Sequence, residues 1–330
     1  MRRLFVAENQ FGIKIWAKDL AGPTCVDWYC PGCKGRVQLK KGKLIAAHFA
    51  HVALEDCKSF SEGETTEHLS GKLLLHQWAP NSELEAYLPE LKQRPDVLWG
   101  NIAFEFQCSS LSFERFLERT ENYVSHRYYP WWLLGQQFHP KKRLSQFQKA
   151  CCYYDQKLGV KLWLLSENDQ EIRLCYQFQW HYQNGYNYEI QVFNYRRDSL
   201  RAILSNKIMD KQSNREWDIF AFQGVLKRKL CQREAKILAA QEKLYLQGGH
   251  LLHLPQWCYE DSRYFFFFEE ELLYLRWLYL KSSTYNQWLF LIEKDYFNWF
   301  FPLIPKEKIL QAIYFECRIL ASSKKIRESK

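Results

Sequence analysis

Glycine and proline are scarce in this sequence, with 14 Gly and 10 Pro among 330 residues. Collagen-like and low-complexity chains contain far more of both residues, so these classes are excluded. Hydrophobic residues make up 47% of the chain and charged residues 25%, which is typical of a folded protein. At about 150 residues per domain, this length predicts roughly two domains.

The sequence also lacks a long uninterrupted apolar run. A membrane-spanning helix needs about 20 such residues, and the most apolar stretches, 264–280 and 288–304, are interrupted by charged side chains. Glu8, Asn9 and Gln10 likewise interrupt the segment in which the apolar core of a signal peptide would lie. We therefore expect no membrane span, no secretion and a cytoplasmic location.

A regular disulfide pattern is absent as well, because the eleven cysteines are an odd number and, apart from one cluster, irregularly spaced. Secreted scaffolds usually have evenly paired cysteines, so a reducing compartment fits better. What the chain does have is positive charge: 46 Lys and Arg against 37 Asp and Glu give a net charge of +9. This balance favours a polyanionic partner such as nucleic acid.

Turn signals and hydrophobic periodicity divide the chain into three predicted domains: 1–60, 61–197 and 198–330. The first is strand-like, with a hairpin over 36–49 that turns at Gly42. The third has helical spacing and few glycines. In the second domain the residue pattern predicts a helix over 64–78, capped by Thr65 or Ser61. The elements predicted after it are strands over 84–88, 96–99 and 102–108, a helix over 113–127, and strands over 131–134, 161–165 and 173–195. The predicted fold class is a mixed α/β core between a β-rich module and a helical domain.

A metal-binding pattern lies in the first domain. Cys30-Pro-Gly-Cys33 is followed by His48 and His51, and Cys57 comes six residues later. Thiolates and imidazoles suit Zn²⁺, and a pair of cysteines two residues apart is a common half of a tetrahedral site. The spacing predicts a structural zinc ion held by four of these five residues. Two alternatives are a redox-active cysteine pair and ordinary side chains without a metal.

Two carboxylates in the second domain form a candidate catalytic centre. Asp96 follows Pro95 at the start of one predicted strand, and Glu105 lies on the next strand with Gln107 on the same face. Two converging carboxylates would bind Mg²⁺ or Mn²⁺, which prefer oxygen ligands. Such an ion activates water and stabilises charge on a scissile phosphate. The alternative is a turn residue at Asp96 and a solvated strand face at Glu105.

Pro-Asp, eight residues and Glu-x-Gln together resemble the PD-(D/E)XK nuclease signature, whose core has the predicted order of helices and strands. More narrowly, the ordered motifs CPGC, HFAH, EGETTEHLSGK, LKQRPDV, FEFQCSS, ERTENY and PWWLLG resemble the CoiA competence protein family of transformable Gram-positive bacteria. The similarity extends from about Cys30 to Gly135. The resemblance implies a restriction-endonuclease-like core with a zinc-ribbon-like N-terminal module and a cytoplasmic nuclease-like factor of natural transformation.

The resemblance assigns metal binding to Asp96 and Glu105, with Glu67 as an auxiliary acid. Gln107 occupies the position at which the superfamily usually has lysine. A neutral amide cannot supply a positive charge, so either another residue such as Lys72 supplies it or turnover is slow or absent. His68 lies one helical turn before Lys72, and both could equally form a solvated helix face.

Arg115, Arg119 and Tyr123 recur at i, i+4 and i+8 on the helix over 113–127. This spacing places them on one side, where they could contact a DNA backbone and stack on a base. Alternatively, Arg119 pairs with a neighbouring glutamate and Tyr123 is part of the core.

These observations favour a Mg²⁺- or Mn²⁺-dependent deoxyribonuclease that acts on single-stranded or branched DNA, either incoming or in recombination intermediates. The alternative is a weakly active or inactive DNA-binding adaptor that recruits recombination proteins. A zinc-dependent regulator without nuclease chemistry would leave Asp96 and Glu105 unexplained. The sequence does not define the oligomeric state or the DNA structure preferred.

Overall fold

The computed structural model describes residues 4, 6–22, 26–31, 33–42, 47–52, 65–205, 216–294 and 298–328. Within them, contacts divide the chain into two compact units. The first comprises 1–139, 163–174 and 192–206, and the second comprises 140–162, 175–191 and 207–330. The three predicted domains remain a prediction, because these units are defined by contacts and each combines separate stretches of chain.

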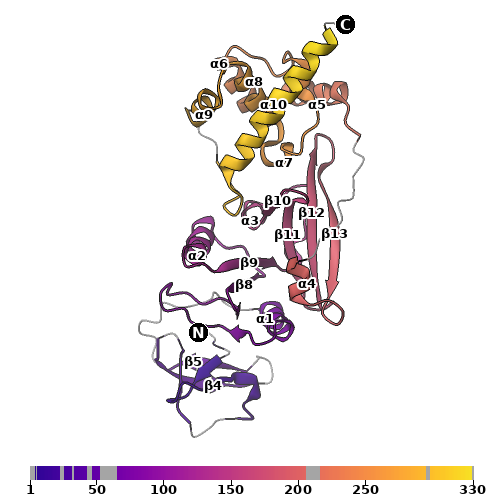
Figure 1. Cartoon of the computed structure of the whole chain (residues 1–330). Helices are drawn as coiled ribbons and strands as arrows, with labels where there is room; N and C mark the ends of the chain where they lie inside the picture. The colour runs from indigo at the N-terminus through magenta and orange to yellow at the C-terminus, as the bar shows by residue number, and fades with distance from the viewer. Residues whose placement is uncertain are drawn as a thin grey trace. The chain divides into compact units, whose positions relative to one another are not determined.

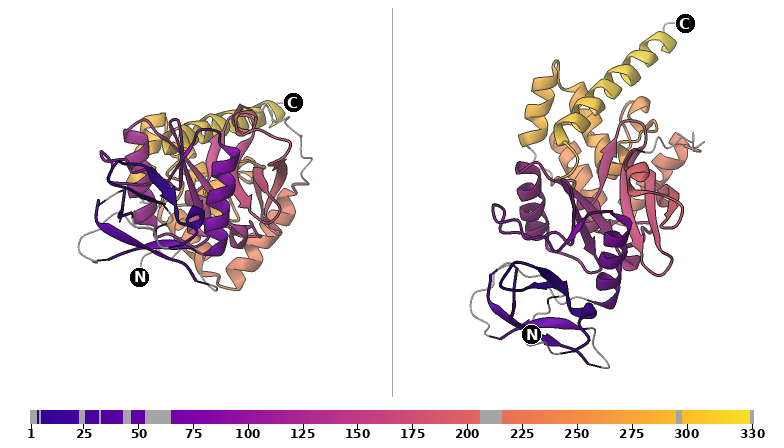
Figure 2. Two further views of the ribbon diagram at one scale, coloured as in Figure 1. Left: turned by 90° about the horizontal axis from the view of Figure 1, so that it is seen from below. Right: turned by 60° about the horizontal axis from the view of Figure 1, so that its bottom comes forward.

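The N-terminal segment forms a five-stranded sheet in the order β2-β1-β3-β4-β5. Its elements are β1 (Val6–Glu8), β2 (Lys14–Trp16), a 3-10 helix (Ala17–Asp19), β3 (Trp28–Tyr29), β4 (Arg36–Lys40) and β5 (His48–His51). The predicted hairpin is present, since β4 and β5 pair antiparallel with Leu39 opposite Phe49. Phe49 is fully buried with Trp28 and Val37 in a small core. Both views of Figure 2 draw these strands in indigo.

A larger, mixed sheet follows in the order β13-β12-β11-β9-β8-β7-β6, with β10 paired to β11 (Figure 1). The elements of this region are α1 (Thr66–Trp78), β6 (Glu83–Leu84), β7 (Val97–Trp99), β8 (Ile102–Gln107), α2 (Phe113–Ser125), β9 (Tyr129–Leu134), a 3-10 helix (Gln136–Phe138), α3 (Gln146–Ala150), β10 (Tyr153–Asp155), β11 (Gly159–Ser166), β12 (Glu171–His181), β13 (Gly185–Asn194) and α4 (Leu200–Ser205). β6, β7 and β8 are antiparallel neighbours, whereas β8, β9 and β11 run parallel. The predicted mixed α/β core is confirmed.

Helices α1 and α2 cover opposite faces of β8. Successive strand residues point to opposite faces, and Phe106 contacts α1 whereas Glu105 contacts α2. Thr65 caps α1 as expected, because its hydroxyl accepts the N–H of His68 at 3.1 Å. The competing cap, Ser61, lies outside the described residues.

The C-terminal region is helical, as predicted. Its elements are α5 (Ile219–Cys231), α6 (Ala235–Leu246), a 3-10 helix (Gln256–Tyr259), α7 (Phe265–Phe268), a 3-10 helix (Glu269–Glu271), α8 (Leu272–Leu280), α9 (Tyr285–Lys294) and α10 (Lys306–Glu328). Arg276 of α8 is fully buried and pairs with Glu316 of α10, the long yellow helix in Figure 1. None of the helices in the described ranges is both long and apolar enough to cross a bilayer.

Gly71 sets the distance between α1 and β8. A Cβ atom there would lie 2.1 Å from the ring of Phe106, which is itself fully buried. Only glycine therefore lets the helix approach the strand closely enough for His68 and Lys72 to reach the sheet.

We predict that Gly71→Ala lowers the free energy of unfolding by about 1–3 kcal/mol, because the added methyl group forces the ring or the helix to move. Gly224→Ala is the matched control, since nothing lies within 4 Å of a Cβ atom at that position of α5. There, alanine should raise stability by about 0.5–1 kcal/mol through helix propensity. Urea unfolding of both variants measures the difference, and equal effects would contradict the close approach.

Candidate functional site

Asp96 lies just before β7, toward the end of the sheet at which β8 and β9 finish. Its backbone N–H donates to the carbonyl of Phe104 at 3.0 Å, and its Oδ2 atom accepts the N–H of Phe106 at 2.8 Å. The Asp96 carboxylate therefore satisfies a backbone group of β8, which fixes its position.

Two side chains of α1 surround this carboxylate. Lys72 Nζ lies 3.7 Å from Asp96 Oδ1, and His68 Nε2 lies 3.2 Å from Asp96 Oδ2. Burial would raise the pKa of Asp96, but the charges of His68 and Lys72 and the hydrogen bonds outweigh burial and hold that pKa well below its usual range. Asp96 is therefore ionised at neutral pH. The alternative of a solvated helix face does not apply to Lys72, whose side chain is 2% exposed.

Glu105 lies on β8 and is 1% exposed, so the solvated-face alternative does not apply to it either. Its Oε1 atom accepts hydrogen bonds from Arg119 and from the hydroxyl of Tyr123, both on α2. Burial raises the pKa of Glu105, Arg119 partly offsets that rise, and the negative charge of Asp96 adds to it. The two carboxylates thus interact electrostatically while different helices hold them.

Glu67 and Gln107 lie at the same end of the sheet. Glu67 Oε1 accepts the N–H of Gln136 at 3.0 Å, directly after β9. Gly135 makes room for it, because a Cβ atom there would lie 2.5 Å from Glu67 Oε1. Gln107 is the last residue of β8, and its carbonyl accepts the N–H of Gly135 at 2.8 Å. The sequence-predicted acids and the amide therefore gather near the ends of β8 and β9.

The expected DNA-contacting row on α2 differs from what the structure contains. Tyr123 is fully buried, and Arg119 has a 14% exposed side chain directed at Glu105. Arg115 has a 42% exposed side chain and pairs with Glu118 at 2.6 Å. Arg119 and Tyr123 lie on the side of α2 that faces β8, where both donate hydrogen bonds to the buried Glu105 carboxylate. Of the three side chains, that of Arg115 is the most accessible to solvent.

Sequence reasoning missed two charged residues of this site. Glu85 accepts a hydrogen bond from Lys72 Nζ at 2.7 Å, and Arg94 NH1 lies 3.8 Å from Glu85 Oε2. Glu85 is 8% exposed. The sequence held one signal for Glu85: it is the single acid within the apolar segment 84–88. An acid that is buried with such a segment requires a cationic partner.

A second candidate site lies in the small sheet. Among the described residues, Cys30, Cys33 and His51 are the one group of three or more Cys, His, Asp or Glu side chains whose ligand atoms all lie within 4.8 Å of one another. Cys33 Sγ lies 3.3 Å from His51 Nε2. The turn between the strands is closed by the N–H of Lys34, which donates to the carbonyl of Cys30 at 2.8 Å. Two thiolates and an imidazole form a donor set that suits Zn²⁺.

Strand alternation separates the two histidines. His48 and His51 are three residues apart on β5, so their side chains leave the strand on opposite faces. His51 lies with the cysteines, and His48 is not part of that group. Cys57, the other predicted ligand, lies outside the described residues. Of the five predicted zinc ligands, the structure therefore brings together Cys30, Cys33 and His51.

Comparisons with known proteins match the two regions of the chain that contain the candidate sites. Residues 64–208 match the family model described as "Competence protein CoiA, nuclease-like domain", which defines the class of the α/β domain as nuclease-like. Residues 20–60 match the model described as "Competence protein CoiA, N-terminal domain". Together the two matches cover more than half of the chain. The chain belongs to the CoiA competence protein family.

A curated relative supports the same family. The chain is 31% identical over 141 residues to "Competence protein CoiA" of Bacillus subtilis (strain 168). The alignment covers 40% of this chain and 38% of the relative, so well under two thirds of that protein is matched. No solved structure matches the chain significantly.

The donor set predicts about one equivalent of zinc in the purified protein, as for a single four-ligand site. His51→Ala should lose most of the metal, whereas the matched variant His48→Ala should keep it, because His48 leaves β5 on the other face. Elemental analysis of gel-filtered protein measures both. A folded wild-type protein without zinc, or equal loss from the two histidine variants, would contradict the assignment.

Proposed function

We propose that this protein is a Mg²⁺- or Mn²⁺-dependent deoxyribonuclease that acts in the cytoplasm on incoming DNA or recombination intermediates during natural transformation. The family carries the name of a competence protein and its domain is described as nuclease-like. The observation that carries the proposal is the ionised Asp96, whose negative charge acts on Glu105 of β8 and whose Oδ1 atom lies 3.7 Å from the buried Lys72. These residue types are those that phosphodiester hydrolysis uses.

In this proposal Asp96 and Glu105 hold the divalent ion, and Glu67 is an auxiliary acid. Carboxylate oxygens are the ligands that Mg²⁺ and Mn²⁺ prefer. A bound ion would lower the pKa of its water and neutralise charge on the phosphate. The side-chain amide of Gln107 has both a donor and an acceptor with which to orient a water molecule, but it contributes no charge.

Lys72 supplies the missing positive charge. Its ammonium group comes from α1 rather than from β8, and Glu85 and Asp96 hold it in place. A fixed cation beside a candidate metal ligand stabilises the negative charge that develops on a phosphate during hydrolysis. In this proposal Lys72 of α1 therefore replaces the lysine that the nuclease superfamily usually has at the position of Gln107.

A second candidate function is an inactive DNA-binding adaptor that recruits recombination proteins. One observation favours it: Glu105 Oε1 already accepts hydrogen bonds from Arg119 and Tyr123. A carboxylate that is neutralised by arginine binds a cation less readily. In this reading the acids stabilise the fold, and the protein binds DNA without cutting it.

Cleavage of DNA distinguishes the two functions. Purified wild type should cut single-stranded, duplex or branched DNA with Mg²⁺ or Mn²⁺ but not with EDTA, and Asp96→Ala or Glu105→Ala should lower the rate by at least about 10²-fold. Denaturing gels of end-labelled DNA measure this. Binding without cutting in every metal would instead identify the adaptor.

The role of Lys72 has its own test. Lys72→Gln should reduce the rate constant for cleavage by about 10²–10³-fold, because a positive charge is lost next to the phosphate. The double variant Lys72→Gln with Gln107→Lys returns that charge from β8 and should recover much of the rate. If Lys72 only stabilises the fold, the thermal midpoint and the rate will fall together, and the second substitution will not restore cleavage.

A further inference from the structure

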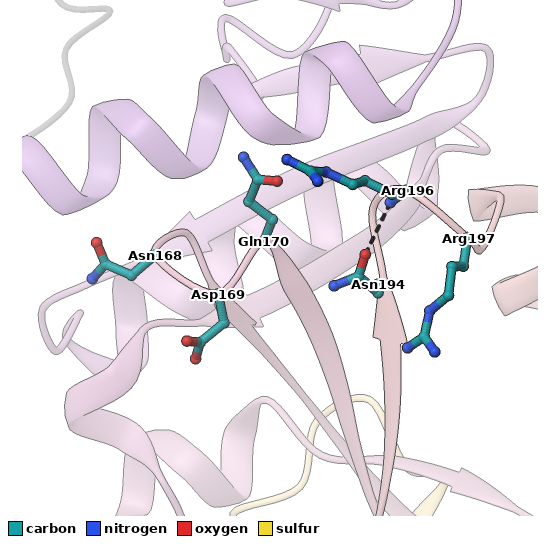
Figure 3. A pocket seen from close by; sticks show the side chains of 6 residues that line it. All are labelled: Asn168, Asp169, Gln170, Asn194, Arg196 and Arg197. Carbon is teal, nitrogen blue, oxygen red and sulfur yellow. Dashed lines mark hydrogen bonds between the residues drawn. The ribbon is translucent and has the colours of Figure 1, made fainter.

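A pocket of about 590 Å³ lies between the turn that follows β11 and the turn that follows β13 (Figure 3). Its lining consists entirely of amide and charged side chains: Asn168, Asp169, Gln170, Asn194, Arg196 and Arg197. The two turns are joined by the N–H of Tyr195, which donates to the carbonyl of Gln170 at 3.0 Å. All of these residues belong to the first compact unit, which also contains the candidate nuclease site.

The pocket lies at the same end of the sheet as Gln107. β8, β9 and β11 run parallel, with Gln107 opposite Leu134 and Leu134 opposite Leu164. The turn after β11 therefore follows the ends of β8 and β9 along one border of the sheet. Open α/β sheets bind ligands at this border, where the parallel strands end.

Hydrogen bonds connect the candidate nuclease site with the pocket. The backbone of Gln136 donates to Glu67, and its side chain Nε2 lies 3.4 Å from Ser166 Oγ. Ser166 in turn donates to Asp169 Oδ2 at 2.8 Å. Because these bonds form a continuous series, the pocket is held in a fixed position relative to Glu67.

The charges in the lining leave two arginines available for a ligand. Asp169 pairs with Arg173 at 2.6 Å, so its negative charge is already compensated. Arg196 and Arg197 are exposed, and no hydrogen bond or ion pair joins either guanidinium group to another part of the chain that the structure describes. Asn194 Oδ1 accepts the N–H of Arg196 at 3.1 Å and so fixes the turn that presents them.

This lining suits a nucleotide. Arginine forks bind phosphate oxygens, and asparagine, glutamine and arginine side chains match the donor and acceptor groups on the edges of bases. In Figure 3 the side chain of Arg196 extends toward that of Gln170, whereas Arg197 extends the other way. A purely apolar ligand would leave these polar groups unsatisfied.

We infer that this pocket binds a nucleotide of the same DNA strand that reaches Asp96 and Glu105. The inference rests on the proposed function, because that function identifies DNA as the polymer. Four strand spacings separate β8 from β13, which is about 19 Å along the border of the sheet. This distance corresponds to about five or six nucleotides of a strand stacked as in B-DNA, at about 3.4 Å each, so the pocket contacts the strand several nucleotides from the scissile phosphate.

The test measures binding of fluorescent single-stranded oligonucleotides of 4 and 12 nucleotides by anisotropy, in buffer without Mg²⁺ or Mn²⁺ so that no cleavage occurs and the zinc ion stays in place. The double variant Arg196→Ala and Arg197→Ala should bind the 12-mer about tenfold more weakly. Loss of two phosphate contacts should also lower the slope of log K against log salt by about 1.4. The 4-mer, too short to reach both sites, should bind weakly to both proteins.

The matched control is Lys227→Ala with Arg228→Ala, which removes two exposed positive charges from α5 in the other compact unit. It should leave binding within about twofold of the wild type. Equal weakening by both double variants, unchanged binding by the Arg196 and Arg197 variant, or tight binding of a mononucleotide alone would overturn the inference. In those cases wild-type cleavage with Mn²⁺ would still support the proposed nuclease, whereas a wild type that neither binds nor cuts DNA removes both.

Discussion

The candidate site depends on the burial of three carboxylates, those of Asp96, Glu105 and Glu85, beside cations from two helices. An isolated charge in a protein interior is strongly unfavourable, so each acid must be paired. Lys72 of α1 forms ion pairs with Asp96 and Glu85, and Arg119 of α2 forms an ion pair with Glu105. Because the pairs join each helix to the sheet, the same interactions that compensate the charges also fix the positions of the helices.

This constraint explains the positions of the acids. The Asp96 carboxylate also accepts the backbone N–H of Phe106 and so is joined to β8. Gly71 and Gly135 provide the space that lets α1 approach the strand and Glu67 approach the turn after β9. Small residues thus make the space in which the ion pairs hold the carboxylates.

Much of the fold could be predicted from the sequence, because periodicity and turn residues report local structure. The helix at α1 with its Thr65 cap, the three strands before α2, and the hairpin that holds His51 were all predicted. The partners of charged residues could not be predicted in the same way. Arg119 and Tyr123 share a helix face with Arg115, but only the packing of α2 on β8 decides that they face Glu105. The ion pairs of Glu85 with Lys72 and Arg94 form only when α1 packs against the sheet. The pocket at Arg196 forms only where two turns, at 168–170 and 194–197, meet.

The group of Cys30, Cys33 and His51 illustrates the same limit at a smaller scale. The spacing of Cys30 and Cys33 predicts a metal site, but strand alternation on β5 decides which histidine accompanies them. A module whose core contains few large side chains gains stability from an ion that joins its loops. In our proposal the two sites differ in role: a zinc ion at the cluster would stabilise the small sheet, and the carboxylates at the larger sheet would bind the catalytic ion.

The central claim is that Asp96 and Glu105 form a site for a divalent metal ion despite the hydrogen bonds that Glu105 accepts from Arg119 and Tyr123. Calorimetric titration of Mn²⁺ into zinc-loaded wild type and Glu105→Ala tests it most directly. The account predicts one saturable Mn²⁺ site in the wild type and none in the variant, with both proteins folded by circular dichroism. Absence of binding to the wild type, or the same binding to Glu105→Ala, would contradict it.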